Sequence, residues 1–278
     1  MNENLAEKAV KLSLQNISHS YTDTSGQSME AINNISLNIK DGEFVAIVGS
    51  SGCGKSTLLN IMCGILEPSQ GSVLLDGHAL RNAKSKIGYI SQMDTLLPWR
   101  RVIKNVALGL EIEGKSKKER LQIAKELIET SGLSGFEDKY PFELSGGMRK
   151  RVIIIRALAQ NPDVIFMDEP FGPLDIFTKT MLQQEILKIW SEHKNTIIYI
   201  THDIAEAIVL ADRIILLSYR PATIKAEYKV ELPRPRIIEE CKYNPYFLEL
   251  EKEIWDTIKE DVKIAQQEEF YNNAKKNI

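Results

Sequence analysis

One stretch of this chain reads Gly49-Ser50-Ser51-Gly52-Cys53-Gly54-Lys55-Ser56-Thr57 and matches the pattern G-x-x-x-x-G-K-[ST]. The apolar run at 44–48 before it is short and rich in β-branched residues, which predicts a buried strand. The run at 58–62 after it predicts a helix that ends at Gly64. A strand, a glycine-rich loop and a helix are the context that a phosphate-binding loop requires.

The chemistry expected of this loop follows from its residue types. Glycines let backbone N–H groups turn inward around phosphate oxygens, and the N-terminus of the next helix adds a positive dipole end. Lys55 can reach the β- and γ-phosphates of a nucleotide. The hydroxyl of Ser56 can complete the coordination shell of a Mg²⁺ ion. We therefore predict that 49–57 binds the phosphates of a nucleotide together with Mg²⁺.

Composition indicates an ordinary globular chain. Its 278 residues are 43% hydrophobic and 26% charged, with a net charge of −3, so no basic field favours a nucleic-acid partner. The three cysteines are an odd number without metal-site spacing, which suits a reducing compartment. The first ten residues lack the apolar core of a signal peptide, and no run of 18 apolar residues occurs. We expect a cytoplasmic protein.

The pattern along the chain predicts an α/β fold. Alternating residues at 11–21 and 31–39 predict an antiparallel pair of strands ahead of the phosphate loop. Buried strands that alternate with helices further on predict a mostly parallel sheet with helices on both faces. These strands are expected at 71–76, 86–91, 164–167, 196–200 and 213–217, and the helices at 117–131, 149–160, 175–192, 204–211 and 246–267.

Polar groups follow two of the buried strands, at the sheet edge where ligands bind in open α/β sheets. Asp168 follows four apolar residues, as expected for the carboxylate that helps to hold Mg²⁺ near a phosphate loop. Glu169 comes next and could orient or deprotonate the water that attacks the γ-phosphate. His202 follows the strand at 196–200 and could contact the same phosphate. Taken alone, 168–170 could equally be a charged turn.

The order of these motifs resembles the ATP-binding cassette of ABC transporters, over about residues 12–232. The residues that carry the resemblance are Tyr21, Gly49–Thr57, Gln92, Leu144–Met148, Asp168, Glu169, Asp175 and His202. The resemblance implies a P-loop ATPase with a mostly parallel sheet, an antiparallel β-subdomain and a small helical subdomain at about 93–160. It assigns 10–232 to the ATPase domain and 233–278 to a C-terminal linker and helical extension, whose linker is the Pro-Arg-Pro-Arg run at 233–236.

The resemblance also implies roles for single residues. Tyr21 would stack on adenine, and Gln92 would approach Mg²⁺ and the attacking water. Ser145, Gly146 and Gly147 would close over the γ-phosphate of ATP held by a second copy of the chain. Asp175 would lie at the seam of that homodimer. One phosphate loop and one signature per chain imply two composite sites in a head-to-tail pair with twofold symmetry.

Several details narrow the resemblance to importers of nitrate, sulfonates, taurine and related small molecules. They are the run Thr95-Leu96-Leu97-Pro98-Trp99-Arg100, the signature Ser-Gly-Gly-Met-Arg, the run 170–175 and the Pro-Arg-Pro-Arg run. Met148 and Lys150 stand where the wider family usually has Gln, and Pro173 replaces a small residue. Trp99 either anchors its loop in the core or contacts a partner.

The predicted function is thus ATP hydrolysis that drives uptake of a small molecule through separate membrane permease subunits. An extracytoplasmic binding protein would deliver that small molecule to the permease. The chain would lie peripherally at the cytoplasmic face of the membrane, with the Gln92–Arg101 loop as the surface that transmits closure. The alternatives are a soluble single-cassette ATPase, such as a cluster-assembly scaffold, and the ATPase subunit of an exporter. A small-molecule kinase would leave the Ser-Gly-Gly element unexplained.

Overall fold

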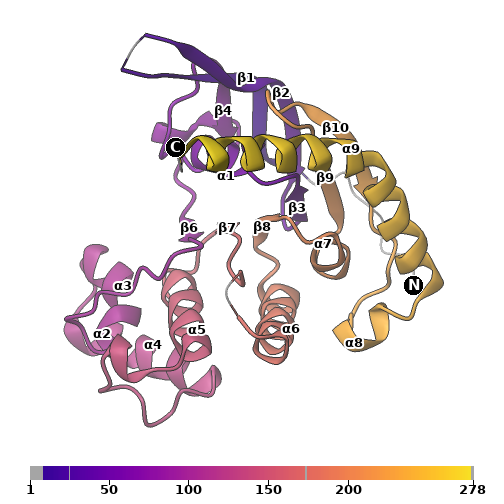
Figure 1. Cartoon of the computed structure of the whole chain (residues 1–278). Helices are drawn as coiled ribbons and strands as arrows, with labels where there is room; N and C mark the ends of the chain where they lie inside the picture. The colour runs from indigo at the N-terminus through magenta and orange to yellow at the C-terminus, as the bar shows by residue number, and fades with distance from the viewer. Residues whose placement is uncertain (1–8, 25, 173, 277–278) are drawn as a thin grey trace. The chain divides into compact units, whose positions relative to one another are not determined.

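The computed structural model describes residues 9–24, 26–172 and 174–276 (Figure 1). Pro173 and most of the N-terminal segment on which the signal-peptide prediction rests lie outside these described residues. The chain divides into two compact units. Unit 1 combines residues 1–84 with 196–278, and unit 2 comprises 85–195. The predicted boundary at Leu232, between the ATPase domain and the C-terminal extension, stays a prediction.

Unit 1 contains the predicted antiparallel strands. They form a sheet in the order β2-β1-β4-β5, with every neighbouring pair antiparallel. Alternating side chains of β1, including Leu12 and Leu14, are buried, so one face of the sheet belongs to the core. The strands are β1 (Val10–Thr22), β2 (Ser28–Lys40), β4 (Gln70–Leu75) and β5 (His78–Ala79).

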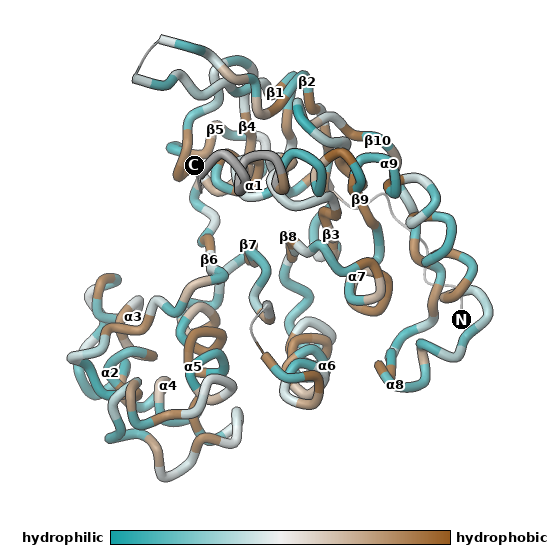
Figure 2. The backbone as a smooth tube through the Cα atoms, in the orientation of Figure 1, coloured by the Kyte–Doolittle hydropathy of each residue, from teal (hydrophilic) through white to brown (hydrophobic). Residues whose placement is uncertain are grey.

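A second group of strands in unit 1 runs in the order β10-β9-β3-β8. Strand β3 pairs in parallel with both β8 and β9, and β10 returns antiparallel to β9. All residues of β3 and β8 are buried, as expected for parallel strands covered on both faces, and Figure 2 shows the hydrophobic colour along β3. The bounds are β3 (Phe44–Val48), β8 (Thr196–Thr201), β9 (Arg213–Leu217) and β10 (Ile224–Lys229).

Unit 1 contains five helices in the part that the structure describes. They are α1 (Lys55–Met62), a 3-10 helix at Leu80–Asn82, α7 (Ile204–Leu210), α8 (Ile238–Cys241) and α9 (Pro245–Lys276). Helix α9 begins one residue before the predicted start and continues well beyond the predicted end. It buries a stripe that contains Phe247, Leu250, Ile254 and Ile258, whereas Trp255, which the periodicity predicts in the same stripe, is 49% exposed.

The segment between β10 and α8 has no regular structure, yet its arginines are firmly held. Arg236 is buried and donates hydrogen bonds to the carbonyl oxygens of Ile208, Val209 and Ala211, at and just after the end of α7. Arg234 pairs with Asp212 at 2.7 Å. The Pro-Arg-Pro-Arg run is therefore packed against the end of α7, where it caps carbonyl groups.

Unit 2 carries one parallel pair of strands and a set of helices. Strand β6 (Ile87–Ile90) pairs in parallel with β7 (Val164–Asp168), so Asp168 is the last residue of a strand rather than the first residue after it. The helices are α2 (Val102–Val106), α3 (Leu108–Ile112), α4 (Lys117–Thr130), a 3-10 helix at Pro141–Glu143, α5 (Gly146–Leu158) and α6 (Ile176–His193). Among the residues that the structure describes, no helix is long and apolar enough to cross a membrane.

Two helices of unit 2 differ from their predicted starts because side chains cap them. Helix α5 starts at Gly146, three residues before the predicted Arg149, since the Ser145 hydroxyl accepts the N–H of Met148 at 3.2 Å. Helix α6 starts at Ile176, one residue after the predicted Asp175, because Asp175 is its N-cap. Ser145 belongs to the predicted signature, and Asp175 is the residue predicted at the dimer seam.

Candidate functional site

The predicted phosphate loop lies between β3 and α1 in unit 1. Lys55 is the first residue of α1 and only 6% exposed. Its ammonium group donates to the carbonyl oxygens of Gly49 and Ser50, both at 2.9 Å. The ammonium group thus links the start of α1 to the first two carbonyl groups of the loop, and it places a positive charge inside the loop. This is the arrangement needed to receive phosphate oxygens.

Glycine is required at particular positions of this loop. Gly52 and Gly54 adopt φ angles of 72° and 117°, which L side chains rarely adopt. A Cβ at Gly49 would lie 2.7 Å from the Sγ of Cys53, and one at Gly54 would lie 3.0 Å from the Ala31 carbonyl oxygen. Any side chain at Gly49 or Gly54 would therefore force the loop to shift.

Two features of the loop fit an anionic ligand. Helix α1 follows Gly54, which has no side chain to cap the helix, so the backbone N–H groups of its first turn face the loop without an N-cap side chain. The buried hydroxyl of Ser50 has no hydrogen-bond partner among the described residues. The N-terminus of a helix and an unsatisfied buried hydroxyl are donors that a phosphate group uses, so this loop fits the nucleotide that its sequence predicts.

Cys53 is fully buried under the loop. Burial raises the pKa of its thiol, and the nearby Lys55 ammonium only partly opposes that effect. The thiol is therefore neutral at pH 7 and fills space, as expected for loop filler.

Tyr21 and His202 are the other two predicted site residues of unit 1. The Tyr21 hydroxyl is hydrogen bonded to the hydroxyl of Thr57 in α1 at 3.2 Å, and its ring packs edge-on against His19. Tyr21 is therefore placed beside the phosphate loop's helix, while its stacking on adenine stays a prediction. His202 directly follows β8 and is exposed.

His202 also lines a cavity of about 240 Å³ together with the phosphate loop. Residues Gly49, Ser50 and Ser51 form one side of it, and side chains of α9, among them Trp255, form another. The C-terminal helix is therefore a neighbour of the nucleotide site.

Unit 2 carries the predicted acidic pair at the end of β7. Both Asp168 and Glu169 are half-buried. Glu169 has a φ angle of 40° and precedes Pro170, a combination that sterics disfavour for a residue with a side chain. Strained backbone of this kind costs on the order of 1–3 kcal/mol and clusters at active sites.

Gln92 lies in the loop after β6, and its side chain is exposed. A Cβ at Gly172 would lie 3.7 Å from the Gln92 amide nitrogen, so this loop approaches the turn that follows Glu169. The backbone of the Gln92 loop is held by α5, where the Lys150 ammonium donates to the carbonyl oxygens of Ser91 and Gln92, both at 3.0 Å.

The Ser-Gly-Gly signature forms the start of α5. Ser145 and Gly146 are exposed, and a Cβ at Gly147 would lie 2.6 Å from the Cγ2 of Thr178 in α6. Glycine is therefore needed at Gly147 for α5 and α6 to approach. The exposed N-terminus of α5 has the chemistry to bind a phosphate from outside the chain, as its predicted role in trans requires.

Asp175 accepts the backbone N–H groups of Phe177 and Thr178 at 3.1 and 3.0 Å. Hydrogen bonds from Thr178 lower the pKa of this exposed carboxyl, and the bond from the Thr178 side chain has a larger effect than the one from its backbone N–H. Its observed role is to cap α6, and its place at a dimer seam stays a prediction.

The predicted site residues thus fall into two sets. Unit 1 holds Tyr21, the loop Gly49–Thr57 and His202, and unit 2 holds Gln92, Ser145–Gly147, Asp168, Glu169 and Asp175. No group of three or more His, Cys, Asp or Glu side chains in the described parts is arranged to hold a metal ion. Mg²⁺ does not need such a group, because it commonly takes only one or two carboxylates and shares phosphate oxygens. The predicted magnesium ligands Ser56, Gln92 and Asp168 stay predictions.

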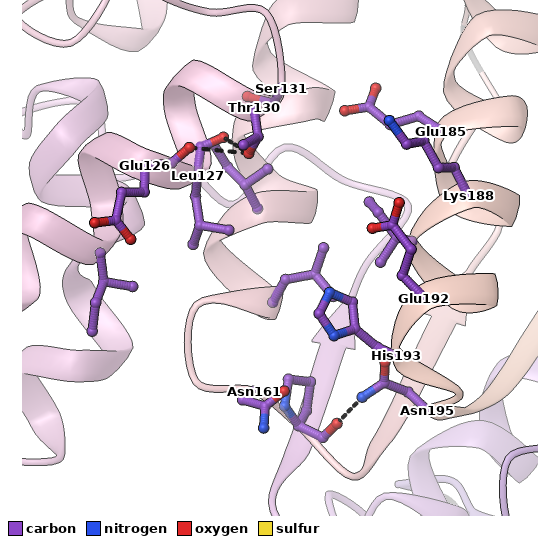
Figure 3. Close-up of a pocket in the computed structure, with 15 residues that line it drawn as sticks. Glu126, Leu127, Thr130, Ser131, Asn161, Glu185, Lys188, Glu192, His193 and Asn195 are labelled. Carbon is purple, nitrogen blue, oxygen red and sulfur yellow. Dashed lines mark hydrogen bonds between the residues drawn. The ribbon is translucent and has the colours of Figure 1, made fainter.

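A larger cavity, of about 360 Å³, lies in unit 2 between α4, α5 and α6 (Figure 3). Glu126, Glu185, Glu192 and His193 contribute to its wall. Arg151 pairs with Glu185 at 3.1 Å. None of the predicted site residues lines this cavity, so it is separate from the nucleotide chemistry.

Two residues near the site had no predicted role in it. Lys150, which holds the Gln92 loop, differs in the sequence only by standing where the wider family usually has Gln. Arg220, in the turn between β9 and β10, donates from its Nε to the Gly52 carbonyl oxygen at 2.5 Å. Nothing in the sequence marks Arg220, because it lies far from residue 52 along the chain.

Comparisons with known proteins show the family to which this chain belongs. A family model described as ABC transporter matches residues 32–172. The chain is 43% identical over 234 residues to the taurine import ATP-binding protein of Rhizobium johnstonii, covering 82% of this chain and 89% of that protein. It is 40% identical over 243 residues to the aliphatic sulfonates import ATP-binding protein of Bacillus cereus, covering 87% and 94%.

Solved structures show the same fold. A dimeric ATP-binding cassette in a post-hydrolysis state, bound to ADP and phosphate, superposes with a TM-score of 0.71. It is 34% identical to this chain and matches over 80% of this chain and all of that one. The predicted fold, a P-loop ATPase with a mostly parallel sheet and an antiparallel β-subdomain, is confirmed.

Proposed function

This chain belongs to the ATP-binding proteins of ABC transporters, and we propose that it energises an importer of small molecules of the nitrate, sulfonate and taurine class. It is an ATPase, and its nucleotide is ATP. The observation that supports the import proposal most directly is the taurine and sulfonate import function named for relatives at 40–43% identity over most of the chain.

The residues of unit 1 would bind the nucleotide. Lys55 would exchange its contacts to the Gly49 and Ser50 carbonyls for the β- and γ-phosphates, since a charged donor prefers an anionic acceptor. The N-terminus of α1 and the unsatisfied Ser50 hydroxyl would complete the cradle. Tyr21 would offer its ring to adenine.

The residues of unit 2 would carry out hydrolysis. Glu169 would accept a proton from the attacking water, and its strained turn would aim the carboxylate away from that of Asp168. Gln92 would orient the same water, and His202 from unit 1 would stabilise charge on the γ-phosphate. Ser56, Gln92 and Asp168 would hold Mg²⁺, which neutralises phosphate charge when it is bound.

The exposed signature supports a homodimer. Ser145, Gly146 and Gly147 begin α5 with N–H groups available to a phosphate from a second copy, and Asp175 would lie at the seam. The similar solved cassette is itself dimeric. Binding of ATP would close two copies head to tail, and hydrolysis would release them.

The surface for a membrane partner is the loop Gln92–Arg101. Trp99 is 72% exposed, so it is not the buried anchor of this loop. The loop is anchored instead by buried Leu96 and by Asn105, whose side chain accepts the Leu97 N–H at 2.8 Å and donates to the Arg100 carbonyl at 2.9 Å. A large apolar side chain on a rigid loop is typical of a docking site.

The experiment that tests this proposal is purification of the tagged chain from its own cells in mild detergent, with mass spectrometry of co-purifying proteins. We expect a multi-span membrane protein in equal amount, and its loss with Trp99→Ala. Ile65→Ala is the matched control, since Ile65 is also an exposed apolar side chain but belongs to unit 1. The chain would then reside at the cytoplasmic face of the membrane.

The substrate class is tested by transport into cells. Uptake of labelled taurine, an alkanesulfonate and nitrate is compared in cells with and without the chain, and we expect one of the three to depend on it. Recovery of soluble proteins alone, under conditions that preserve other membrane complexes, would overturn the importer and favour a cluster-assembly role. Dependence of efflux rather than uptake would indicate an exporter.

A further inference from the structure

Arg220 makes a charged hydrogen bond to the phosphate loop from a distant part of unit 1. Its Nε donates to the Gly52 carbonyl oxygen at 2.5 Å, and a Cβ at Gly52 would lie 2.9 Å from its Nη2. The guanidinium therefore occupies the space that a side chain at Gly52 would need. Hydrogen bonds with an ionised donor are roughly twice as strong as neutral ones.

The bond fixes one peptide unit of the loop from both sides. The carbonyl of Gly52 accepts from Arg220, and the N–H of the same peptide unit, on Cys53, closes a turn onto the Ser50 carbonyl at 3.3 Å. Lys55 donates to that same Ser50 carbonyl. Arg220 and Lys55 thus brace the two sides of one turn, and Lys55 is the residue that must leave this contact when phosphate binds.

Arg220 is in turn placed by the C-terminal helix. Its guanidinium lies over the Tyr219 ring, 5.9 Å from the ring centroid. The Tyr219 hydroxyl donates to the Glu268 carboxylate in α9 at 2.7 Å. Burial and then this bond to Glu268 raise the pKa of Tyr219, so the hydroxyl keeps its proton at neutral pH. The contacts form a chain from α9 to the loop, namely Glu268, Tyr219, Arg220 and Gly52.

Helix α9 also has contacts to the same hairpin that avoid the loop. Lys225 of β10 pairs with Asp261, and the hydroxyls of Tyr228 and Thr257 are hydrogen bonded at 2.8 Å. These contacts dock the helix without touching residues 49–57. They provide a control that separates docking of α9 from placement of Arg220.

We propose that Arg220 is a positioning residue for ATP binding and that the C-terminal helix holds it in place through Tyr219 and Glu268. Loss of the Arg220 contact frees the Gly52–Cys53 peptide unit, and the loop then loses order before phosphate binds. This inference rests on ATP binding by the chain and is independent of the import proposal.

The test is calorimetric titration of the purified full chain with ADP and with a non-hydrolysable ATP analogue, together with steady-state ATPase kinetics. We expect Arg220→Ala to raise the nucleotide Kd by about 5- to 20-fold, the range for loss of one charged hydrogen bond that is partly exposed. KM rises in parallel while kcat changes less than threefold, because binding rather than chemistry is impaired. Arg220→Lys recovers part of the affinity, since it keeps the charge but lacks the flat fork.

The role of α9 is tested by conservative variants that leave the fold intact. Tyr219→Phe and Glu268→Gln should each raise Kd by about two- to fivefold, as expected for a weakened hydrogen bond. Asp261→Asn, which weakens docking of α9 at its other contact, should leave Kd unchanged. Circular dichroism checks that every variant folds.

Two outcomes would overturn the proposal. One is an Arg220→Ala protein that folds and binds nucleotide as the parent does, which removes the positioning role. The other is an Asp261→Asn protein whose Kd rises as much as that of Glu268→Gln, which reduces the effect to general docking of the helix. Neither measurement needs a membrane partner, so failure here leaves the importer proposal untouched, and the reverse also holds.

Discussion

The ammonium nitrogen of Lys150 lies 3.0 Å from the backbone carbonyl oxygen of Gln92. It donates equally to the neighbouring carbonyl of Ser91 and is only 6% exposed. The signature helix α5 therefore holds the loop that carries the predicted water-orienting amide. Lys150, which stands where the wider family usually has Gln, thus links the signature helix α5 to the Gln92 loop.

Replacing Lys150 with Met should slow catalysis more than it weakens binding. Without the ammonium, the two carbonyls lose their donor and the Gln92 backbone can drift, so we expect kcat to fall by about tenfold or more, the cost of a misplaced catalytic group. Nucleotide Kd should stay within twofold, because Lys55 and its loop are unchanged. Lys150→Gln should retain most of the rate, since its amide can still donate. Equal losses in the Met and Gln variants would contradict a role in hydrogen bonding.

The pH dependence of stability supplies a second readout for Lys150. Burial lowers the pKa of its ammonium, and the nearby Asp94 carboxylate only partly opposes that effect. The unfolded chain therefore binds more protons than the folded one between the lowered pKa and the ordinary value of 10.5, so this residue makes stability rise with pH in that window. Urea denaturation at several alkaline pH values should show a smaller rise for Lys150→Met than for the parent.

The regular core was predictable because its signals are local. The phosphate loop, the buried strands around Ala46 and Ile198 and most of the α9 stripe follow from short patterns, and burial departs from the predicted stripe at Trp255. The cap residues Ser145 and Asp175 lay in recognised motifs, and their capping role shifted the helix starts by one to three residues.

The missed features depend on partners far apart in sequence. Strand β10 alternates Ile224, Ala226 and Tyr228 with exposed charged residues, which is a strand signal too polar to stand out. The contact from Arg220 to Gly52 joins residues with no shared pattern, and only tertiary structure brings them together. The capping role of Arg236 was hidden because Pro-Arg-Pro-Arg predicts an open segment by composition alone.

Replacing Glu169 with Gln should uncouple binding from turnover. The amide has the same shape and keeps the strained turn before Pro170, but it cannot accept the proton of the attacking water. We expect the ATPase rate to fall by at least about 100-fold, the usual contribution of a positioned base. ATP binding should persist, and light scattering with ATP should show a stable dimer. Turnover at the parent rate would remove the assigned role.

The matched variant on the binding side is Lys55→Ala. It removes the only ammonium inside the phosphate loop among the described residues, so we expect nucleotide Kd to rise by about 10- to 100-fold, the value of a charged hydrogen bond. Calorimetry distinguishes it from Glu169→Gln, which keeps affinity. Unchanged nucleotide affinity of the Lys55 variant would refute the assignment of 49–57 as the phosphate-binding loop.

Cys53 should behave as an inert thiol in the folded protein. It is fully buried and burial raises its pKa, whereas Cys63 and Cys241 are partly exposed. Because the folded pKa lies above the ordinary 9.0, the stabilising effect of the protonated thiol is complete below pH 9.0 and is lost as pH rises through the folded pKa. Iodoacetamide at pH 8 followed by mass spectrometry should label Cys63 first. Fast labelling of Cys53 would show that the loop opens.

Arg236 should be the most costly charged residue to remove from unit 1. It is 3% exposed, and its guanidinium donates to the carbonyls of Ile208, Val209 and Ala211 at 2.7–3.2 Å and back to the Leu232 carbonyl. Burial lowers its pKa to about 10, so the group is still charged at pH 7. Arg236→Met would leave these carbonyls buried without a donor.

We expect Arg236→Met to destabilise the protein by about 3 kcal/mol, the scale for breaking a buried charged network. Arg234→Met is the control, because Arg234 is more exposed and its main partner is one carboxylate, that of Asp212; its loss should cost about 1 kcal/mol. Hydrogen exchange should show the difference locally, with faster exchange in α7, whose end Arg236 caps and whose start follows His202. An Arg236→Met protein that unfolds at the parent's urea midpoint would show that water replaces the guanidinium and that the segment is an open linker after all.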